Sequence, residues 1–174
     1  MIFDRRRVLQ LSGAAALSAC SRQKTAPPPP QAGADHTIEI VDAKVELAPG
    51  VEVQTTTYNG QFPGPLLRLN EGVPVTIDIR NHTARPEQLH WHGQKVSADV
   101  DGAAEEGTPF IPAHGSRRIS FTPGPAGLRF YHTHVRAGAD LTAGQYGGQV
   151  GPVYIAPKLN PGRYDQEVFL TLKE

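Results

Sequence analysis

Sulfur is nearly absent from this chain of 174 residues, which contains one cysteine, Cys20, and one methionine, Met1. Both lie within the first twenty residues, so the rest of the chain can form no disulfide bond of its own. It also offers no thiolate or thioether to a metal ion, which leaves only nitrogen and oxygen donors there. Disulfide-stapled scaffolds and cysteine-based zinc modules are therefore excluded.

An excess of charge of either sign is also lacking, because 17 basic residues are matched by 17 acidic ones. Three of the basic residues are the adjacent Arg5, Arg6 and Arg7, and no comparable cluster follows them. A surface that binds nucleic acid needs such a cluster to neutralise phosphates. We therefore expect no nucleic-acid partner.

The first twenty residues lack an apolar run long enough to span a membrane. Residues 8–19 would rise about 18 Å as a helix, whereas the hydrocarbon core is about 30 Å thick. Their basic start and small final residues are typical of an export signal. Arg5-Arg6 resembles a twin-arginine signal, and Leu17-Ser18-Ala19-Cys20 resembles a bacterial lipobox. We predict export to the bacterial periplasm or cell envelope, with a lipid anchor on Cys20 as the only membrane contact; an ordinary signal that ends in cysteine is the alternative.

A proline-rich segment follows the signal. Residues 21–35 contain the run Pro27-Pro28-Pro29-Pro30 and few apolar residues, so they predict a disordered linker without a core. Residues 36–160 are long enough for one domain.

Apolar and polar residues alternate with a period of two in this domain. Val75, Ile77 and Ile79 share one face of a predicted strand. Further strands are expected around residues 38–40, 45–47, 119–121 and 153–155, with turn signals between them and at most one short helical turn in residues 137–148. Seven or eight such strands predict an all-β Greek-key sandwich or barrel.

The last residues alternate in the same way, with Val168, Leu170 and Leu172 on one face. Two interpretations are open. The segment 161–174 is either the last strand of this domain or the first strand of a second domain that the chain lacks.

Two histidine pairs carry the chemistry of the sequence, His90-Trp91-His92 and His132-Thr133-His134. Residues i and i+2 of a strand share a face and lie about 6.5–7 Å apart, near enough to reach one metal ion or two adjacent ions. Random placement of the seven histidines gives ~0.24 such pairs. Because two occur, we predict that all four histidines bind metal.

Imidazole binds copper, zinc, iron and nickel. A blue-copper electron-transfer centre also needs a cysteine and usually a methionine, and a structural zinc site of thiolates needs cysteines. Both are excluded, so an all-histidine copper or zinc site remains.

Five motifs occur in the order seen in the laccase-like multicopper oxidases. They are Thr57-Tyr58-Asn59-Gly60-Gln61-Phe62-Pro63-Gly64-Pro65, Arg80-Asn81, His90-Trp91-His92-Gly93, Val100-Asp101-Gly102 and Phe130-Tyr131-His132-Thr133-His134. Over residues 36–174 the chain resembles the first cupredoxin domain of that family.

The resemblance implies a cupredoxin-like fold for residues 36–160 and copper as the cofactor. It implies that His90 binds the type 2 copper of a trinuclear cluster, that His92 and His132 share one type 3 copper, and that His134 binds the other. Asp101 matches an acid thought to steer protons in relatives, although an Asp-Gly turn alone would also explain it.

In the family, a later domain supplies the other half of the cluster and the type 1 copper that accepts electrons. The resemblance therefore implies that this chain is the N-terminal part of an oxidase that reduces O₂ to water while it oxidises a reducing substrate. Only half-sites of the type 2 and type 3 centres are present, and further cupredoxin domains in cis or in trans would complete them. It also favours the second-domain interpretation of residues 161–174.

The second histidine motif departs from the family pattern at one position. Thr133 stands where proline is common in the multicopper oxidases.

Two other functions remain open. The chain could be a tethered periplasmic copper-binding or copper-delivery module, or a subunit of a split oxidase, and would not be catalytic alone. A zinc or copper–zinc dismutase-like site is a weaker third possibility, because residues 58–65 have no place in such proteins.

The remaining candidates have simpler interpretations. Three histidines are predicted to be solvated turn residues: His36, His82 and His114. Glu105 and Glu106 are predicted to lie in a solvated loop, and Trp91 and Tyr131 to pack in the core or an interface.

Overall fold

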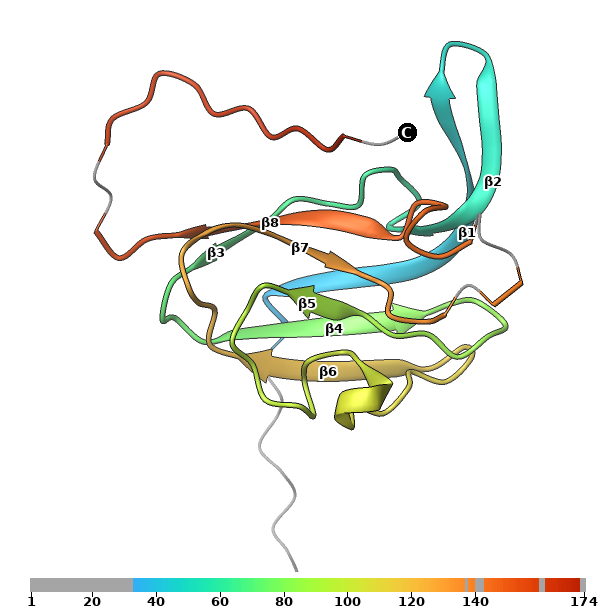
Figure 1. Cartoon of the computed structure of the whole chain (residues 1–174), viewed down its shortest axis with the longest axis horizontal. Helices are drawn as coiled ribbons and strands as arrows, with labels where there is room; N and C mark the ends of the chain where they lie inside the picture. The colour runs from blue at the N-terminus through green and yellow to red at the C-terminus, as the bar shows by residue number, and fades with distance from the viewer. Residues whose placement is uncertain (1–32, 137, 140–142, 160–161, 173–174) are drawn as a thin grey trace, which may run out of the picture. The chain divides into compact units, whose positions relative to one another are not determined.

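The computed structural model describes residues 33–136, 138–139, 143–159 and 162–172, and these contain two stacked four-stranded sheets (Figure 1). The first sheet has the spatial order β2 (Val51–Tyr58), β1 (His36–Ala48), β4 (Val75–Asn81) and β6 (Ser116–Phe121). The second has the order β3 (Leu67–Asn70), β8 (Val150–Ala156), β7 (Gly127–His132) and β5 (His90–His92). One short 3₁₀ turn, η1 (Ala104–Glu106), lies between β5 and β6.

The chain crosses between the two sheets five times, because each of the five connections between β2 and β7 leads from one sheet to the other. Neighbours within a sheet are therefore mostly distant in sequence, as in β1 with β4 and β3 with β8, which pair in parallel. The predicted all-β, cupredoxin-like Greek-key fold is confirmed.

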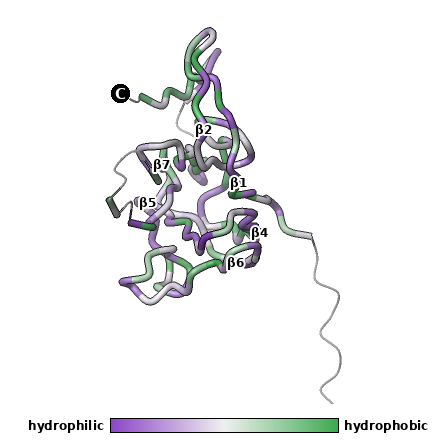
Figure 2. The backbone as a smooth tube through the Cα atoms, turned by 90° about the vertical axis from the view of Figure 1, so that its right-hand side faces the viewer, coloured by the Kyte–Doolittle hydropathy of each residue, from purple (hydrophilic) through white to green (hydrophobic). Residues whose placement is uncertain are grey.

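The core lies between the sheets, where the alternation along each strand turns one set of side chains inward. The hydropathy colour of the chain accordingly changes repeatedly along the strands (Figure 2). Isoleucines of the first sheet meet aromatic and aliphatic residues of the second, and all of the following are almost fully buried: Ile38, Ile40, Ile77, Ile79, Trp91, Tyr131, Val153 and Ile155. Burial of each side chain stabilises the fold by roughly 1.5–3 kcal/mol.

Strand boundaries differ from the prediction in the first sheet. Residues 38–40 and 45–47 belong to one strand, β1, and His36 opens that strand instead of lying in a turn. The threonine-rich β2 and the four-residue β3 were not predicted, because the alternation of apolar residues covers only four positions in each. Pairing with β1 and β8 defines them.

The described part begins with residues that were predicted to be linker. The main-chain amide of Asp35 donates to the Thr76 carbonyl at 2.8 Å, and the Asp35 carboxylate accepts from the Thr76 amide at 2.8 Å. Asp35, the last residue of the predicted linker, is therefore hydrogen-bonded to β4 of the domain. The predicted signal over residues 1–20, the lipidation site Cys20 and residues 21–32 lie outside the described residues. No helix of the described part is both long and apolar enough to cross a membrane.

Residues 162–172 contain no strand, although alternation predicted one near residue 168. Phe169 packs against Tyr154 of β8, and the Arg68 guanidinium lies 5.0 Å from the Phe169 ring and contacts Glu167 at 3.0 Å. Val168 and Leu172 are exposed. The idea that this segment opens a further domain stays a prediction.

An ion pair joins the central strand β4 to the edge strand β6 on the outer face of the first sheet. Asp78 and Arg118 are directly opposite each other, and the carboxylate accepts from Nε at 2.6 Å and from Nη2 at 2.8 Å. The hydrogen bond from Arg118 lowers the pKa of Asp78. A paired arginine–carboxylate contact of this geometry stabilises more than an ordinary surface ion pair does.

Replacement of this carboxylate is expected to destabilise the protein in a pH-dependent way. Because the pKa of Asp78 is lower in the folded chain, its stabilisation is present above the unfolded pKa of about 3.9 and is lost as the pH falls through the folded value. We expect Asp78→Asn to lower the free energy of unfolding by about 1 kcal/mol at neutral pH. The deficit should shrink below about pH 3. Urea unfolding of both proteins checks this, with the exposed Asp165→Asn as the control; an equal deficit at both pH values would contradict it.

Candidate metal centre

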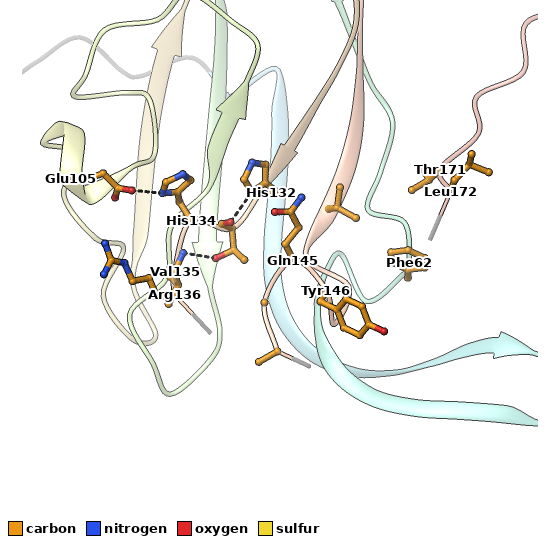
Figure 3. Close-up of a pocket in the computed structure, with 14 residues that line it drawn as sticks. Phe62, Glu105, His132, His134, Val135, Arg136, Gln145, Tyr146, Thr171 and Leu172 are labelled. Atoms are coloured by element: carbon orange, nitrogen blue, oxygen red, sulfur yellow. Dashed lines mark hydrogen bonds and ion pairs between the residues drawn. The ribbon is translucent and has the colours of Figure 1, made fainter. Parts of the chain in front are cut away.

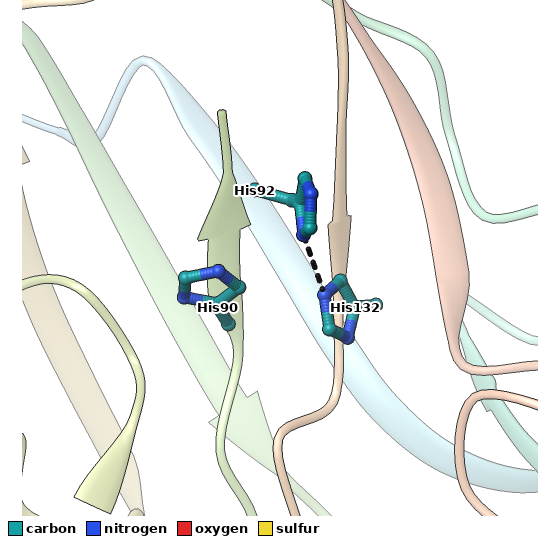
Figure 4. A group of neighbouring side chains, drawn as sticks. All are labelled: His90, His92 and His132. Carbon is teal, nitrogen blue, oxygen red and sulfur yellow. Dashed lines mark hydrogen bonds between the residues drawn. The ribbon is translucent and has the colours of Figure 1, made fainter. Parts of the chain in front are cut away.

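The register between β5 and β7 places three histidines on one face. His90 lies opposite His132, and Trp91 lies opposite Tyr131. Residues directly opposite each other in an antiparallel pair point to the same side of the sheet. Trp91 and Tyr131 are fully buried in the core, so His90, His92 and His132 all point to the other face. One nitrogen from each of the three rings lies within 4.8 Å of the other two (Figure 4).

His134 reaches the same place by a different route. Strand β7 ends at His132, so the assumption that both pairs lie in strands is wrong for the second pair. The chain after β7 is held instead by Thr133, whose amide donates to the Gln149 carbonyl at 3.2 Å. The His134 ring centroid lies 5.0 Å from that of His90 and 5.9 Å from that of His132. All four predicted imidazoles therefore converge.

Oxygen acceptors fix the protonated nitrogen of two rings. His90 Nδ1 lies 2.9 Å from the Asp101 carbonyl oxygen and 3.0 Å from its carboxylate, and His132 Nδ1 lies 2.7 Å from the Thr133 carbonyl. A carbonyl oxygen only accepts, so Nδ1 carries the proton in both rings and Nε2 keeps its lone pair. Both rings therefore present Nε2 for metal binding.

His92 differs from these two rings, because it points Nδ1 and not Nε2 at the cluster. Its Nδ1 lies 3.4 Å from His132 Nε2, and its ring stacks on Phe130 with centroids 4.3 Å apart. Two imidazole nitrogens that bind one metal at about 2.0–2.1 Å with a near-tetrahedral angle lie about 3.3 Å apart. The observed separation fits one shared metal ion without movement of either ring.

Burial keeps His132 in its ligand form. Desolvation lowers the pKa of His132 to about 4, and the nearby rings of His90, His92 and His134 act in the same direction. The ring is therefore neutral at physiological pH, as a metal-binding imidazole must be.

A buried carboxylate, that of Glu87, accepts hydrogen bonds from the segment that carries the second histidine pair. Glu87 is 3% exposed, and its Oε2 accepts from Gln149 Nε2 at 3.1 Å and from Thr133 Oγ1 at 3.4 Å. Burial raises the pKa of Glu87. Proline, which is common at position 133 in the family, could donate neither of the Thr133 hydrogen bonds. Sequence reasoning missed Glu87 and Gln149, because nothing in the sequence links them to residue 133.

Glu105 is exposed, as predicted, and it also contacts the cluster. Its Oε1 lies 3.0 Å from His134 Nδ1, while about half of the side chain remains exposed (Figure 3). Glu105, His132 and His134 also line an open cavity of about 690 Å³, together with Phe62, Tyr146 and other residues.

The other three histidines lie outside the cluster. His82 contacts Glu39 on the outer face of the first sheet, so it is half-exposed but paired. His114 occupies a turn with a φ of 54°, and His36 opens β1. Glu106 is exposed, as predicted.

Known proteins with similar sequences and folds are copper enzymes and copper resistance proteins. The sequence profile described as multicopper oxidase matches residues 39–160. The multicopper oxidase MmcO of Mycobacterium tuberculosis is 30% identical over 138 residues, which cover 79% of this chain and 26% of that protein. Copper resistance protein A of Escherichia coli is 29% identical, with coverages of 82% and 22%.

Among solved structures, the blue copper oxidase from Nitrosomonas europaea superposes with a TM-score of 0.64 at 30% identity. The match covers 72% of this chain and 39% of that one. The chain spans about a quarter of the length of the curated relatives that it matches.

Removal of the most buried imidazole tests the centre. We expect His132→Ala to weaken copper binding at least ~100-fold, because it removes a ring that packs against the other three. A competition titration with a chromophoric copper chelator measures this, and circular dichroism checks that the variant folds. His114→Ala is the matched control and should bind as the unsubstituted chain does. Equal losses in the two variants would contradict the assignment.

Proposed function

Because this chain belongs to the multicopper oxidase family, we propose that it forms the N-terminal, cluster-building domain of an exported oxidase. It contributes four histidines, half of the ligands of a trinuclear copper cluster. The observation that carries this proposal is the convergence of His90, His92, His132 and His134 at one edge of the second sheet.

The geometry supports a particular division of roles. His92 Nδ1 and His132 Nε2 face each other at 3.4 Å, in agreement with a shared type 3 copper. His90 would hold the type 2 copper through Nε2, and His134 would hold the second type 3 copper. When bound, copper supplies the electron transfer by which O₂ is reduced to water while a substrate is oxidised.

Asp101 is proposed to hold and pass protons beside this cluster. Its carboxylate lies 3.0 Å from His90 Nδ1, and it lines an open pocket of about 360 Å³ together with His90 and His134. A carboxylate that contacts a ligand ring and also reaches solvent can orient the ring and exchange protons with water.

The proposed oxidase needs partners that this chain does not contain. The other histidines and the type 1 copper site, which requires cysteine, would come from further cupredoxin domains in cis or in trans. Residues 161–174 are proposed to lead into such a domain. Export through the twin-arginine signal and lipid attachment at Cys20 would place the protein in the periplasm or at the cell envelope.

One observation favours a second candidate function. Three ring nitrogens within 4.8 Å of one another can bind one copper ion without a partner domain. This supports a tethered copper-binding or delivery module; a subunit of a split oxidase is the other form of this candidate. A copper site that fills only when a second cupredoxin chain is added favours the split oxidase, whereas one tight copper per isolated chain favours the module.

Both candidates predict that the isolated chain does not turn over. We expect it to bind copper(II), to lack an intense blue colour and to leave a phenolic dye unoxidised in air, because residues 21–174 offer no cysteine for electron entry. Absorption spectroscopy and a dye-oxidation assay check this. Dye oxidation by the pure chain that disappears in His132→Ala would overturn the half-site proposal.

A further inference from the structure

The ring of His134 needs an orienting partner that the strands do not supply. His134 lies two residues beyond the end of β7, and its side chain is about one-third exposed. The sheet fixes the backbone of the other three histidines but not that of His134. An exposed imidazole without a held Nδ1 can turn about its last side-chain bond and exchange tautomers.

Glu105 provides the contact that does this. Its Oε1 lies 3.0 Å from His134 Nδ1, the same separation as that between Asp101 Oδ2 and His90 Nδ1. In both pairs a carboxylate accepts from Nδ1, which leaves Nε2 of the ring as the metal-binding nitrogen. Figure 3 shows the Glu105 carboxylate directed at the His134 ring.

The turn that carries Glu105 is anchored at both ends. Gly107, with a φ of 102°, ends η1 in a conformation that suits glycine. The Thr108 hydroxyl accepts from the Gly102 amide at 2.9 Å, and the Thr108 amide donates to the Ala103 carbonyl at 3.1 Å. One short loop, residues 101–108, therefore holds a carboxylate against one member of each histidine pair.

We propose that Glu105 is the positioning residue of His134. It fixes the proton on Nδ1 and directs Nε2 toward the cluster. The inference deepens the proposed function, since it takes His134 as a copper ligand. Glu106 is the natural comparison: it carries the same charge on the same turn, and the described part of the chain shows no ion pair of its side chain.

The first test reads the tautomer without copper. Nitrogen-15 NMR of the copper-free chain is expected to show His134 protonated at Nδ1. Glu105→Ala should shift the ring toward the Nε2-protonated form, whereas Glu105→Gln should keep the Nδ1 proton, because its amide oxygen still accepts. Glu106→Ala should leave the spectrum unchanged. A His134 tautomer that is the same in Glu105→Ala and in the unsubstituted chain would overturn the proposal.

The second test asks whether Glu105 acts through His134. Glu105→Ala is expected to weaken copper binding about 10–100-fold, Glu105→Gln less, and Glu106→Ala less than about twofold. In a His134→Ala background the Glu105→Ala effect should disappear. An undiminished effect in that background, or an equal loss in Glu106→Ala, would refute the role. A chain that binds no copper at all would instead refute the proposed function, and the tautomer measurement would still decide the contact.

Discussion

The pairing of β5 with β7 is the constraint on which the rest of this centre depends. Side chains alternate between the faces of a strand, so a slip of one residue would turn the histidines into the core and the aromatic residues out of it. Trp91 and Tyr131 oppose that slip, because both are fully buried and pack against each other with ring centroids 5.9 Å apart. The packing of these two aromatic residues in the core thereby fixes the face of the sheet on which the histidines lie.

Proton placement is the second theme of the site. Four imidazoles within contact of one another would repel as cations, and burial, which lowers the pKa of His132, keeps the most enclosed ring neutral. Oxygen acceptors then determine which nitrogen of a neutral ring carries the proton and which one keeps its lone pair for a metal ion. Asp101 and Glu105 do this from a single loop, while the Thr133 carbonyl does it from the chain itself, held in turn by Glu87 and Gln149. Ligand orientation therefore depends on segments that are far apart in sequence.

The candidate centre lies open on the outer face of the sandwich, which agrees with the proposal that a further domain completes it. The cavity beside His132 and His134 is lined by exposed side chains such as Tyr146 and Leu172. Exposed apolar groups around a polar cluster are typical of an interface between domains. Three of the four rings, His90, His132 and His134, find an oxygen acceptor for Nδ1 within this chain, and under the proposal the remaining ligands come from the further domain.

The sequence by itself determined the all-β class, the four histidines and the exclusion of sulfur ligands, because period-two alternation and the His-x-His spacing are local properties of the chain. It did not predict β2 or β3: β2 is defined by its hairpin with β1, and β3 by its pairing with β8, which is distant in sequence. It also did not reveal that Glu105, which is exposed as predicted, contacts His134, since a glutamate in a polar loop has no local mark of its neighbour. Only the tertiary structure brought residues 87, 105 and 149 to the second histidine pair, because hydrogen bonds between residues remote in sequence exist only once the two sheets have packed.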